Sequence, residues 1–247
     1  RTLATGLVAT APPWADALRA AQLIVITTPD DEIPTVARSL AHEGAVGKEQ
    51  VVMHLAGPLD RGALAALAAT GAALGSYHPL QTVADPASAP ERFAGAYAAV
   101  EGDDRAIAAG EELARALGMT PFRLKSEAKP AYHAGAVFAA NYAVVLAGVA
   151  ERIARGAGIP PELAGKIYLP LLAGAVANVE RLGPVRGLTG PVRRGDVRAI
   201  MAHLGALEDG DQQLYRTLGL EAVRLAREAG LDPVTARQVE ALLSDEP

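Results

Sequence analysis

The chain has 247 residues, of which 50% are hydrophobic and 4% aromatic, and its formal net charge at pH 7 is −5. A chain of this length can bury a full core, and an acidic balance without a cluster of lysines or arginines excludes nucleic acid as an expected partner. Cysteine is absent, which excludes disulfides, iron–sulfur clusters and thiolate chemistry, and we expect a cytoplasmic protein.

In the first half of the chain, short apolar runs alternate with stretches typical of helices. We predict strands at residues 23–28, 51–55, 73–77, 97–100 and 120–124. We predict helices between them at residues 33–41, 61–69 and 104–118. The expected helix caps are Asp30 or Asp31, then Asp60, then Asp103 with Asp104. Strands and helices that alternate at this spacing predict a doubly wound parallel sheet of the α/β class.

The alternation stops after Leu124, and we predict a domain boundary near Lys125. Residues 1–125 then form the sheet domain and residues 126–247 an all-helical domain. The helices predicted there lie at residues 130–156, 161–182, 197–204, 209–229 and 232–243. The most apolar stretch, residues 134–150, is shorter than a membrane span and is interrupted by glycine and asparagine, so we expect a buried helix and no membrane partner.

Polar and small residues follow three of the predicted strands. They are Thr28-Pro29-Asp30, His54 to Gly57, and His78-Pro79. The carboxyl ends of parallel strands form the edge where ligands bind, and glycine lets a flat ligand approach the backbone closely. This pattern favours a nucleotide-type cofactor, although the G-x-G-x-x-G turn that would strengthen the prediction is missing. We interpret the chain, which begins at Arg1, as lacking the segment that would contain it.

His78 is a candidate acid or base within this group. Pro79 biases it toward extended backbone, so its imidazole is expected where a strand gives way to a loop, held by Gln81. A histidine there titrates near neutral pH and can exchange a proton. The alternative is that His78 only fixes a loop by hydrogen bonding.

Polar residues also interrupt the helices of the second half. His133, Val137 and Asn141 are spaced four apart and are expected to share one helix face. Asn178 is a similar interruption in the next long helix. A buried amide or imidazole without a partner costs roughly 1–3 kcal/mol, so these residues predict either a polar pocket or hydrogen bonds between helices.

The segment Leu188 to Asp196 combines a Thr-Gly-Pro turn with an arginine. Arg194 offers a planar fork suited to a carboxylate, and Asp196 either orients that arginine or caps the following helix. A surface loop with a helix cap is the alternative. We predict no metal site, because the five histidines show no i, i+4 pairing and cysteine is absent.

Three motifs occur in order along the chain: S-Y-H-P-L-Q-T at residues 76–82, A-Y-H-A-G-A-V-F-A-A-N-Y at 131–142, and L-T-G-P-V-R-R-G-D at 188–196. Together they resemble the Rossmann-like proteins with a DUF2520 C-terminal domain, a family often described as NADP-dependent oxidoreductases. The resemblance implies an NAD(P)-binding Rossmann domain followed by a helical domain like the C-terminal domain of 6-phosphogluconate dehydrogenase. More distant similarity extends to pyrroline-5-carboxylate reductase, ketopantoate reductase and prephenate dehydrogenase.

The resemblance implies an oxidoreductase that uses NADP or NAD to transfer a hydride to or from a small carboxylate-bearing substrate. The implied cofactor-binding residues are Thr28, Pro29, Asp30, His54 and Gly57. The implied catalytic residues are His133, His78 and Asn141, and the implied substrate-binding residues are Asn178, Thr189, Gly190 and Arg194. His133, near a helix N-terminus, is expected to stay neutral and to lie nearest the reacting carbon.

Two further expectations concern turnover and assembly. A dinucleotide-binding sensor without turnover is the alternative function, because no residue set in this sequence demands catalysis. The apolar helix around residues 167–179 predicts a homodimer through the helical half, which the distant relatives also suggest.

Overall fold

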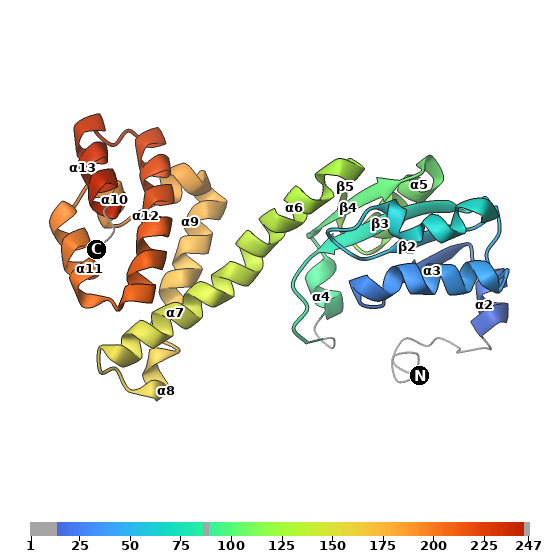
Figure 1. Ribbon diagram of the computed structural model, residues 1–247, viewed down its shortest axis with the longest axis horizontal. Helices are drawn as coiled ribbons and strands as arrows, with labels where there is room; N and C mark the ends of the chain where they lie inside the picture. The colour runs from blue at the N-terminus through green and yellow to red at the C-terminus, as the bar shows by residue number, and fades with distance from the viewer. Residues whose placement is uncertain (1–13, 86–88, 245–247) are drawn as a thin grey trace. The chain divides into compact units, whose positions relative to one another are not determined.

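The computed structural model describes residues 14–85 and 89–244 and is shown in Figure 1. Its contacts divide the chain after Asn141 into two compact units, residues 1–141 and residues 142–247. The first unit contains the sheet, and the second is helical. The sheet unit thus continues beyond Lys125, near which the sequence predicts the domain boundary.

The first unit is built on a five-stranded sheet in the order β1-β2-β3-β4-β5. The strands are β1 (Leu23–Ile26), β2 (Val51–His54), β3 (Ala73–Leu80), β4 (Tyr97–Gly102) and β5 (Thr120–Arg123). Each corresponds to a predicted strand, and the predicted Rossmann-like α/β class is confirmed. The first three strands are parallel, as are β4 and β5.

One strand pair departs from the predicted parallel arrangement, because β3 and β4 run antiparallel. A parallel pair requires a crossover that carries the chain back along the sheet, whereas an antiparallel pair needs only a reversal of direction. In the described part of the segment between β3 and β4, the one helix is the short α4 (Ala89–Phe93). The chain therefore returns from the same end of the sheet and pairs antiparallel.

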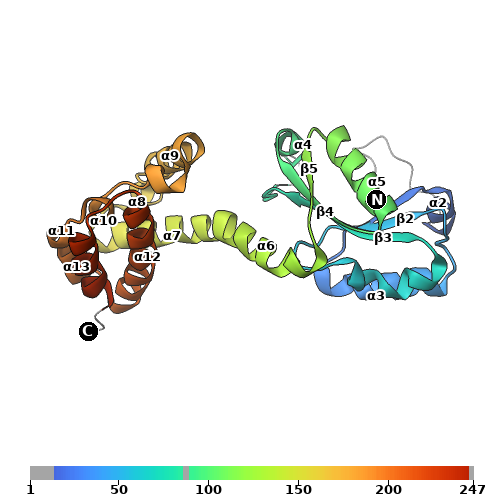
Figure 2. The same cartoon turned by 90° about the horizontal axis from the view of Figure 1, so that it is seen from above.

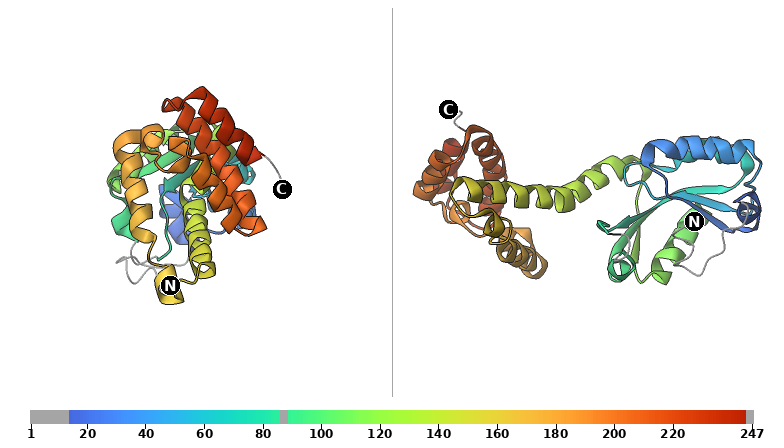
Figure 3. Two further views of the ribbon diagram at one scale, coloured as in Figure 1. Left: turned by 90° about the vertical axis from the view of Figure 1, so that its left-hand side faces the viewer. Right: turned by 90° about the horizontal axis from the view of Figure 1, so that it is seen from below.

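Helices cover both faces of the sheet. Helix α3 (Ile33–His42) and the 3₁₀ helix η2 (Arg61–Thr70) pack on one face, against Ile24, Val52 and Leu74. Helix α5 (Asp104–Ala116) packs on the other face, against Val51, Met53, Tyr77 and Val100. Successive residues of a strand point to opposite faces, which explains how both layers are filled. Figure 2 shows the two layers on either side of the sheet, and the right-hand view of Figure 3 shows them from below.

The aspartate caps are only partly as predicted. Asp60 accepts a hydrogen bond from the N–H of Gly62 and caps η2. Asp103 precedes α5, but its carboxylate accepts instead from the N–H of Leu74 and pairs with Arg61. Neither the 3₁₀ turn η1 (Asp30–Glu32) nor α3 has a side-chain cap, so the caps predicted at Asp30 or Asp31 and at Asp103 are wrong. A neighbouring strand end competes for Asp103 because its free N–H is equally in need of an acceptor.

The predicted helix at residues 130–156 is interrupted in its middle. A 3₁₀ turn, η4 (Ser126–Ala128), leads into α6 (Lys129–Ala136), which is followed by the π-helical turn η5 (Val137–Asn141) and by α7 (Tyr142–Gly156). The whole stretch Ser126–Gly156 is long and apolar enough to cross a membrane by length and composition, which by itself is weak evidence for a span. None of its most apolar window is buried within the chain, so the predicted burial of this helix is wrong for the single chain.

The second unit is a group of helices with its own core. Besides α7 it contains α8 (Pro161–Ala164), α9 (Leu169–Gly187), α10 (Pro191–Arg194), α11 (Val197–Ala206), α12 (Asp209–Glu228) and α13 (Pro233–Ser244). The core residues include Ile200, Val223, Val239 and Leu243. The single helix predicted at residues 161–182 is therefore two helices. Asp196 accepts a hydrogen bond from the N–H of Ala199 and so caps α11. Of its two predicted roles, orienting Arg194 or capping the following helix, the structure shows the cap.

Candidate functional site

A polar row crosses the sheet near the carboxyl end of β2. His54 of β2 lies opposite Ser76 of β3, and Ser76 lies opposite Glu101 of β4. Register partners project to the same face of a sheet, so the three side chains stand side by side. They continue the face on which α3 and η2 cover apolar residues, and all three are buried. A buried polar row at the end of an apolar layer marks the candidate site.

His54 is enclosed in this row. Its side chain is fully buried, and its Nε2 lies 2.9 Å from the carbonyl oxygen of Asp60. Burial lowers the pKa of His54, because a charged imidazolium would lose its hydration there. Among the described residues, Nδ1 of His54 has no hydrogen-bond partner.

His78 lies two residues beyond Ser76 and contacts α6. Its Nδ1 is 2.8 Å from the hydroxyl oxygen of Tyr132, and its ring centroid is 5.7 Å from that of His133. The pKa of His78 is lowered to about 4, chiefly by burial and in smaller part by the nearby His133 and Lys129. The prediction that His78 titrates near neutral pH is therefore wrong, because α6 packs against the imidazole and removes part of its hydration.

The predicted partner of His78 is also different. The side-chain nitrogen of Gln81 donates to the carbonyl oxygen of Arg92 at 2.9 Å, while Tyr132 takes the place expected for Gln81 at His78. Burial raises the pKa of Tyr132 to about 12, so its hydroxyl stays protonated at neutral pH. A neutral imidazole and a protonated phenol thus share one hydrogen bond.

Gly57 lies directly against both imidazoles. A Cβ added at this position would be 2.2 Å from Nδ1 of His133 and 3.0 Å from Nε2 of His78. Glycine is required at this close approach for steric reasons alone. In this structure the space that Gly57 leaves open is occupied by the two histidine rings.

A cavity of about 750 Å³ opens beside this group. The polar residues that line it include His78, Tyr132, His133 and Asn141. Gln81 and Thr82, which follow β3, also line it. His133, Val137 and Asn141, which the sequence places on one helix face, all line the cavity. Neither lysine nor arginine is among the residues that line it. All of these residues belong to the first unit.

The strand end after β1 provides the remaining predicted cofactor-binding residues. Thr28, Pro29 and Asp30 are exposed and follow Ile26, the residue of β1 that pairs with His54. The negative charge of Asp30 raises the pKa of both His54 and Lys129, which indicates that it faces the same edge. The structure thus brings Asp30, His54 and Gly57 to one edge of the sheet.

A lysine that the sequence pattern does not predict is buried in this site. Lys129 is fully buried, and its Nζ donates to the hydroxyl oxygen of Ser76 at 2.6 Å. Ser76 in turn donates to Glu101 at 3.0 Å, and Ser126 donates to the other oxygen of that carboxylate at 2.8 Å. Burial lowers the pKa of Lys129 to about 8, and the charge of Glu101 opposes the shift. The signal in the sequence was Glu101, an acidic residue within an otherwise apolar strand.

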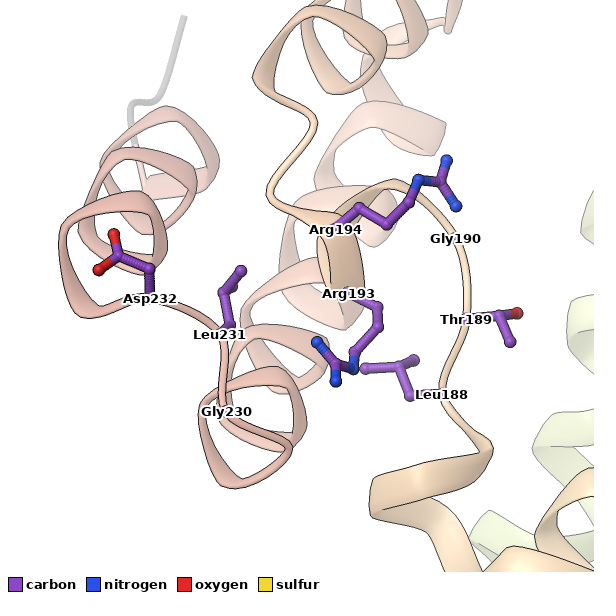
Figure 4. A pocket seen from close by; sticks show the side chains of 8 residues that line it. All are labelled: Leu188, Thr189, Gly190, Arg193, Arg194, Gly230, Leu231 and Asp232. Atoms are coloured by element: carbon purple, nitrogen blue, oxygen red, sulfur yellow. The ribbon is translucent and has the colours of Figure 1, made fainter.

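A second cavity, of about 560 Å³, lies in the helical unit and is shown in Figure 4. Thr189, Gly190 and Arg194 line it together. Arg193 donates to the carbonyl oxygen of Ala229 at 2.8 Å, whereas Figure 4 shows the Arg194 guanidinium and the Thr189 hydroxyl pointing away from Leu231 and Asp232. Asn178, on α9, is half-buried and is not among the residues that line this cavity. The structure therefore groups three of the four predicted substrate-binding residues.

Residues 96–243 match the family model described as a domain of unknown function, DUF2520, and residues 8–79 match a model for a Rossmann-like domain. The chain belongs to the DUF2520 family. The resemblance drawn from the three sequence motifs is thereby confirmed. The DUF2520 match spans the boundary at Asn141 and includes the cavity of the helical unit and the α6 and η5 side of the cavity beside His78, which itself precedes the match.

Solved structures share the fold of this DUF2520 protein. A protein from Thermotoga maritima is 24% identical with a TM-score of 0.62, the match covering 90% of this chain and 79% of that one. A Bacteroides fragilis protein, provisionally described as an NADP oxidoreductase, is 21% identical with a TM-score of 0.66, covering 93% and 83%. The NADP-bound pyrroline carboxylate reductase of Plasmodium falciparum is 11% identical with a TM-score of 0.59, covering 96% and 82%. No curated protein matches the sequence significantly.

Proposed function

We propose that this DUF2520 protein is an oxidoreductase that uses NADP or NAD to transfer a hydride to or from a small carboxylate-bearing substrate. The observation that supports this most directly is the group of His133, His78, Tyr132 and Asn141 around one cavity beside the carboxyl ends of a Rossmann-like sheet. Hydride transfer to a carbonyl or imine carbon needs a proton donor and polar groups that orient the substrate. The cavity offers both.

The residues at the sheet edge fit the nicotinamide end of such a cofactor. His54 has a buried Nδ1 without a partner among the described residues, and buried polar atoms normally have one. We assign Thr28, Pro29, Asp30, His54 and Gly57 to cofactor binding. The bound cofactor would supply the hydride from nicotinamide C4. The NADP-bound reductase of Plasmodium falciparum and the Bacteroides fragilis protein support NADP as the cofactor, with NAD as its close substitute.

His133 is proposed to deliver the proton. Its Nδ1 is buried against Gly57, which leaves Nε2 as the nitrogen that can serve the cavity it lines. His78, with its pKa near 4 and its bond to Tyr132, is neutral at physiological pH and is proposed to orient the substrate or cofactor rather than to titrate. Asn141 completes the catalytic set as a hydrogen-bonding group for the substrate.

A substrate carboxylate needs a cationic partner. Arg194 is exposed, and its planar guanidinium can bind a carboxylate through two parallel hydrogen bonds. We propose Arg194, Thr189, Gly190 and Asn178 as substrate-binding residues. The pyrroline carboxylate reductase among the similar structures acts on a small cyclic imine that bears a carboxylate, which makes this compound class the first to test.

We further propose a cytoplasmic homodimer formed through the helical unit. Large apolar side chains are exposed on α7 and α9, among them Val144 at 74%, Leu171 at 71% and Val176 at 62%. Val144 and Leu171 line an apolar groove of about 660 Å³ formed by α7, α8 and α9. Apolar surface on this scale marks an interaction site, and a second copy of the chain is its proposed occupant.

Cofactor binding tests the proposal at its first step. Titration of the natural full-length protein with NADPH or NADH should raise its melting temperature and change its tryptophan and tyrosine fluorescence. No response to either compound would sink the proposal. If NADPH or NADH binds but is not oxidised in the presence of small keto acids and cyclic imines, the result would instead favour the alternative function, a dinucleotide-binding sensor without turnover.

A further inference from the structure

A hydrogen-bonded chain of buried groups connects the two elements that bear the histidines. It runs from Lys129 on α6 through Ser76 on β3 to Glu101 on β4, with contacts of 2.6 and 3.0 Å. All three residues are buried, with exposed fractions of 0% for Lys129 and Ser76 and 3% for Glu101. A charged pair this deep is costly to desolvate, so its presence calls for a reason beyond stability.

The placement of the chain supplies that reason. Lys129 precedes His133 by four residues, which puts both on one face of α6. Ser76 precedes His78 by two residues, which puts both on one face of β3. The Lys129–Ser76 hydrogen bond therefore joins α6 to β3 next to the contact between His133 and His78, one helical turn earlier on α6 and two residues earlier on β3.

Glu101 fixes the position of this Lys129–Ser76 hydrogen bond. Its carboxylate accepts from Ser76, from Ser126 just ahead of α6, and from the N–H of Arg61 at the start of η2. Three segments of the first unit thus converge on the carboxylate that β4 provides. A displacement of α6 by one turn or of β3 by one residue would break these bonds.

The ammonium group also acts on the imidazoles by its charge. Lys129 lowers the pKa of both His54 and His78. The other ionisable groups that act on this cluster are His133 on α6, Glu101 on β4, Asp60 ahead of η2 and Asp30 of η1. Burial is the largest cause at each histidine, and the lysine adds to it.

We propose that Lys129, held by Ser76 and Glu101, is the positioning residue that fixes His133 against His78 and acts on His78 through its charge. Its Nζ is fully buried, so it acts through the histidines and does not touch the substrate. The consequence for turnover rests on the proposed reductase function. The geometry of the histidine pair and the pKa of His78 do not depend on that function, and both can be measured without cofactor or substrate.

The test is an NMR titration of isotopically labelled histidines in the wild-type protein and in Lys129→Met. The substitution keeps an unbranched side chain of similar length and removes its charge, so the pKa of His78 should rise above about 4. The matched control is Lys125→Met, an exposed lysine four residues earlier, which should leave the titration unchanged. An unchanged pKa of His78 in folded Lys129→Met would overturn the charge role.

A second variant covers the case in which Lys129→Met does not fold. Lys129→Met with Glu101→Gln removes both buried charges and retains a side chain that can accept from Ser76. It should show the same rise in the pKa of His78, and an unchanged value would again count against the proposal. Ser76→Ala removes the hydrogen bond between Lys129 and Ser76 and leaves the charge of Lys129 in place. The magnetisation transfer between the His78 and His133 rings should then weaken. Full retention of this transfer would refute the positioning role.

Turnover provides the last arm. If the protein reduces a substrate with NADPH, Lys129→Met should lower kcat about tenfold or more with little change in the KM for NADPH, and the acid limb of the pH profile should move to higher pH. If no substrate is turned over by the wild type, the reductase proposal fails while the titration still decides the role of Lys129.

Discussion

His133 stands against Gly57 so closely that a Cβ on the glycine would lie 2.2 Å from its Nδ1. This contact joins the turn after β2 to the start of the long helical stretch at α6. It also buries one ring nitrogen of His133 and leaves the other for the cavity. The position of the proposed proton donor therefore depends on a residue with no side chain.

Gly57→Ala should displace His133 and weaken the site. The added methyl group overlaps both imidazoles, and overpacking of this kind costs about 1–3 kcal/mol in the free energy of unfolding. Denaturant unfolding followed by circular dichroism measures the loss. Gly47→Ala is the matched control, since a Cβ there meets nothing within 4 Å and should change stability by less than about 0.5 kcal/mol. Equal effects of the two substitutions would contradict the contact.

His133→Gln and His78→Gln separate the roles of the two histidines. If His133 delivers the proton, its loss should lower kcat about 100-fold while NADPH binding stays intact. His78→Gln should have a smaller effect on kcat, because His78 is neutral and bonded to Tyr132. His203→Gln, on the exposed surface of α11, serves as the control. The roles are reversed if His133→Gln keeps nearly full turnover and His78→Gln abolishes it with cofactor affinity unchanged.

The strands could be predicted from the sequence because each is a compact apolar run bounded by turn residues. The antiparallel pairing of β3 with β4 could not, since it depends on the path of the connection between them rather than on either strand. The interruption at η5 escaped for a similar reason: Val137–Asn141 has an ordinary helical sequence. Its π turn is a property of the folded backbone.

Several residues of the candidate site could be predicted from the sequence, but the hydrogen bonds and pKa shifts that link them could not. His78, His133 and Asn141 were identified from residue type and position, and they do line one cavity. Their charge states were not accessible, because the low pKa of His78 arises from burial by α6. Lys129 was missed because its partner Ser76 lies 53 residues away, and a lysine in the first turn of a helix is ordinarily exposed.

Stability should depend on pH through His78. Its pKa is about 4 in the folded chain against an ordinary value of 6.5, so the unfolded chain binds the proton more tightly between these pH values. The contribution of His78 is complete above pH 6.5 and is lost as the pH falls toward 4, by about 2 kcal/mol after allowance for solvent screening. The free energy of unfolding, measured with urea at several pH values across this range, should fall less steeply with decreasing pH in His78→Gln than in the wild type.

The control for that experiment is His42→Gln, an exposed residue at the end of α3, which should retain the wild-type slope. His54, whose pKa is also lowered, contributes to the slope in every variant, so the comparison rests on the difference between proteins. Identical slopes in the wild type and His78→Gln would show that the imidazole is accessible to water.

Leu171→Glu should disrupt the proposed dimer. The residue is 71% exposed on α9 within the apolar groove, and a buried carboxylate at an interface without a partner is strongly unfavourable. Light scattering at micromolar concentration should give about twice 25.4 kDa for the wild type of this chain and 25.4 kDa for the variant. Val234→Glu places the same charge on α13, outside the groove, and should leave the mass unchanged.

A wild-type chain that scatters as a monomer would contradict the dimer. A chain that stays in solution only with detergent would point instead to a lipid surface as the cover for residues 126–156, which meet the length and hydropathy of a membrane span.

The most direct test of the central claim is hydride transfer itself. The natural full-length protein would be incubated with NADPH deuterated at nicotinamide C4 and a panel of carboxylate-bearing cyclic imines and small keto acids, and the products analysed by mass spectrometry. We expect deuterium in the reduced carbon of at least one product, at a rate that falls about 100-fold in His133→Gln and not in His203→Gln. Tight binding of NADPH with no deuterium in any product, or transfer that His133→Gln leaves unchanged, would contradict the account.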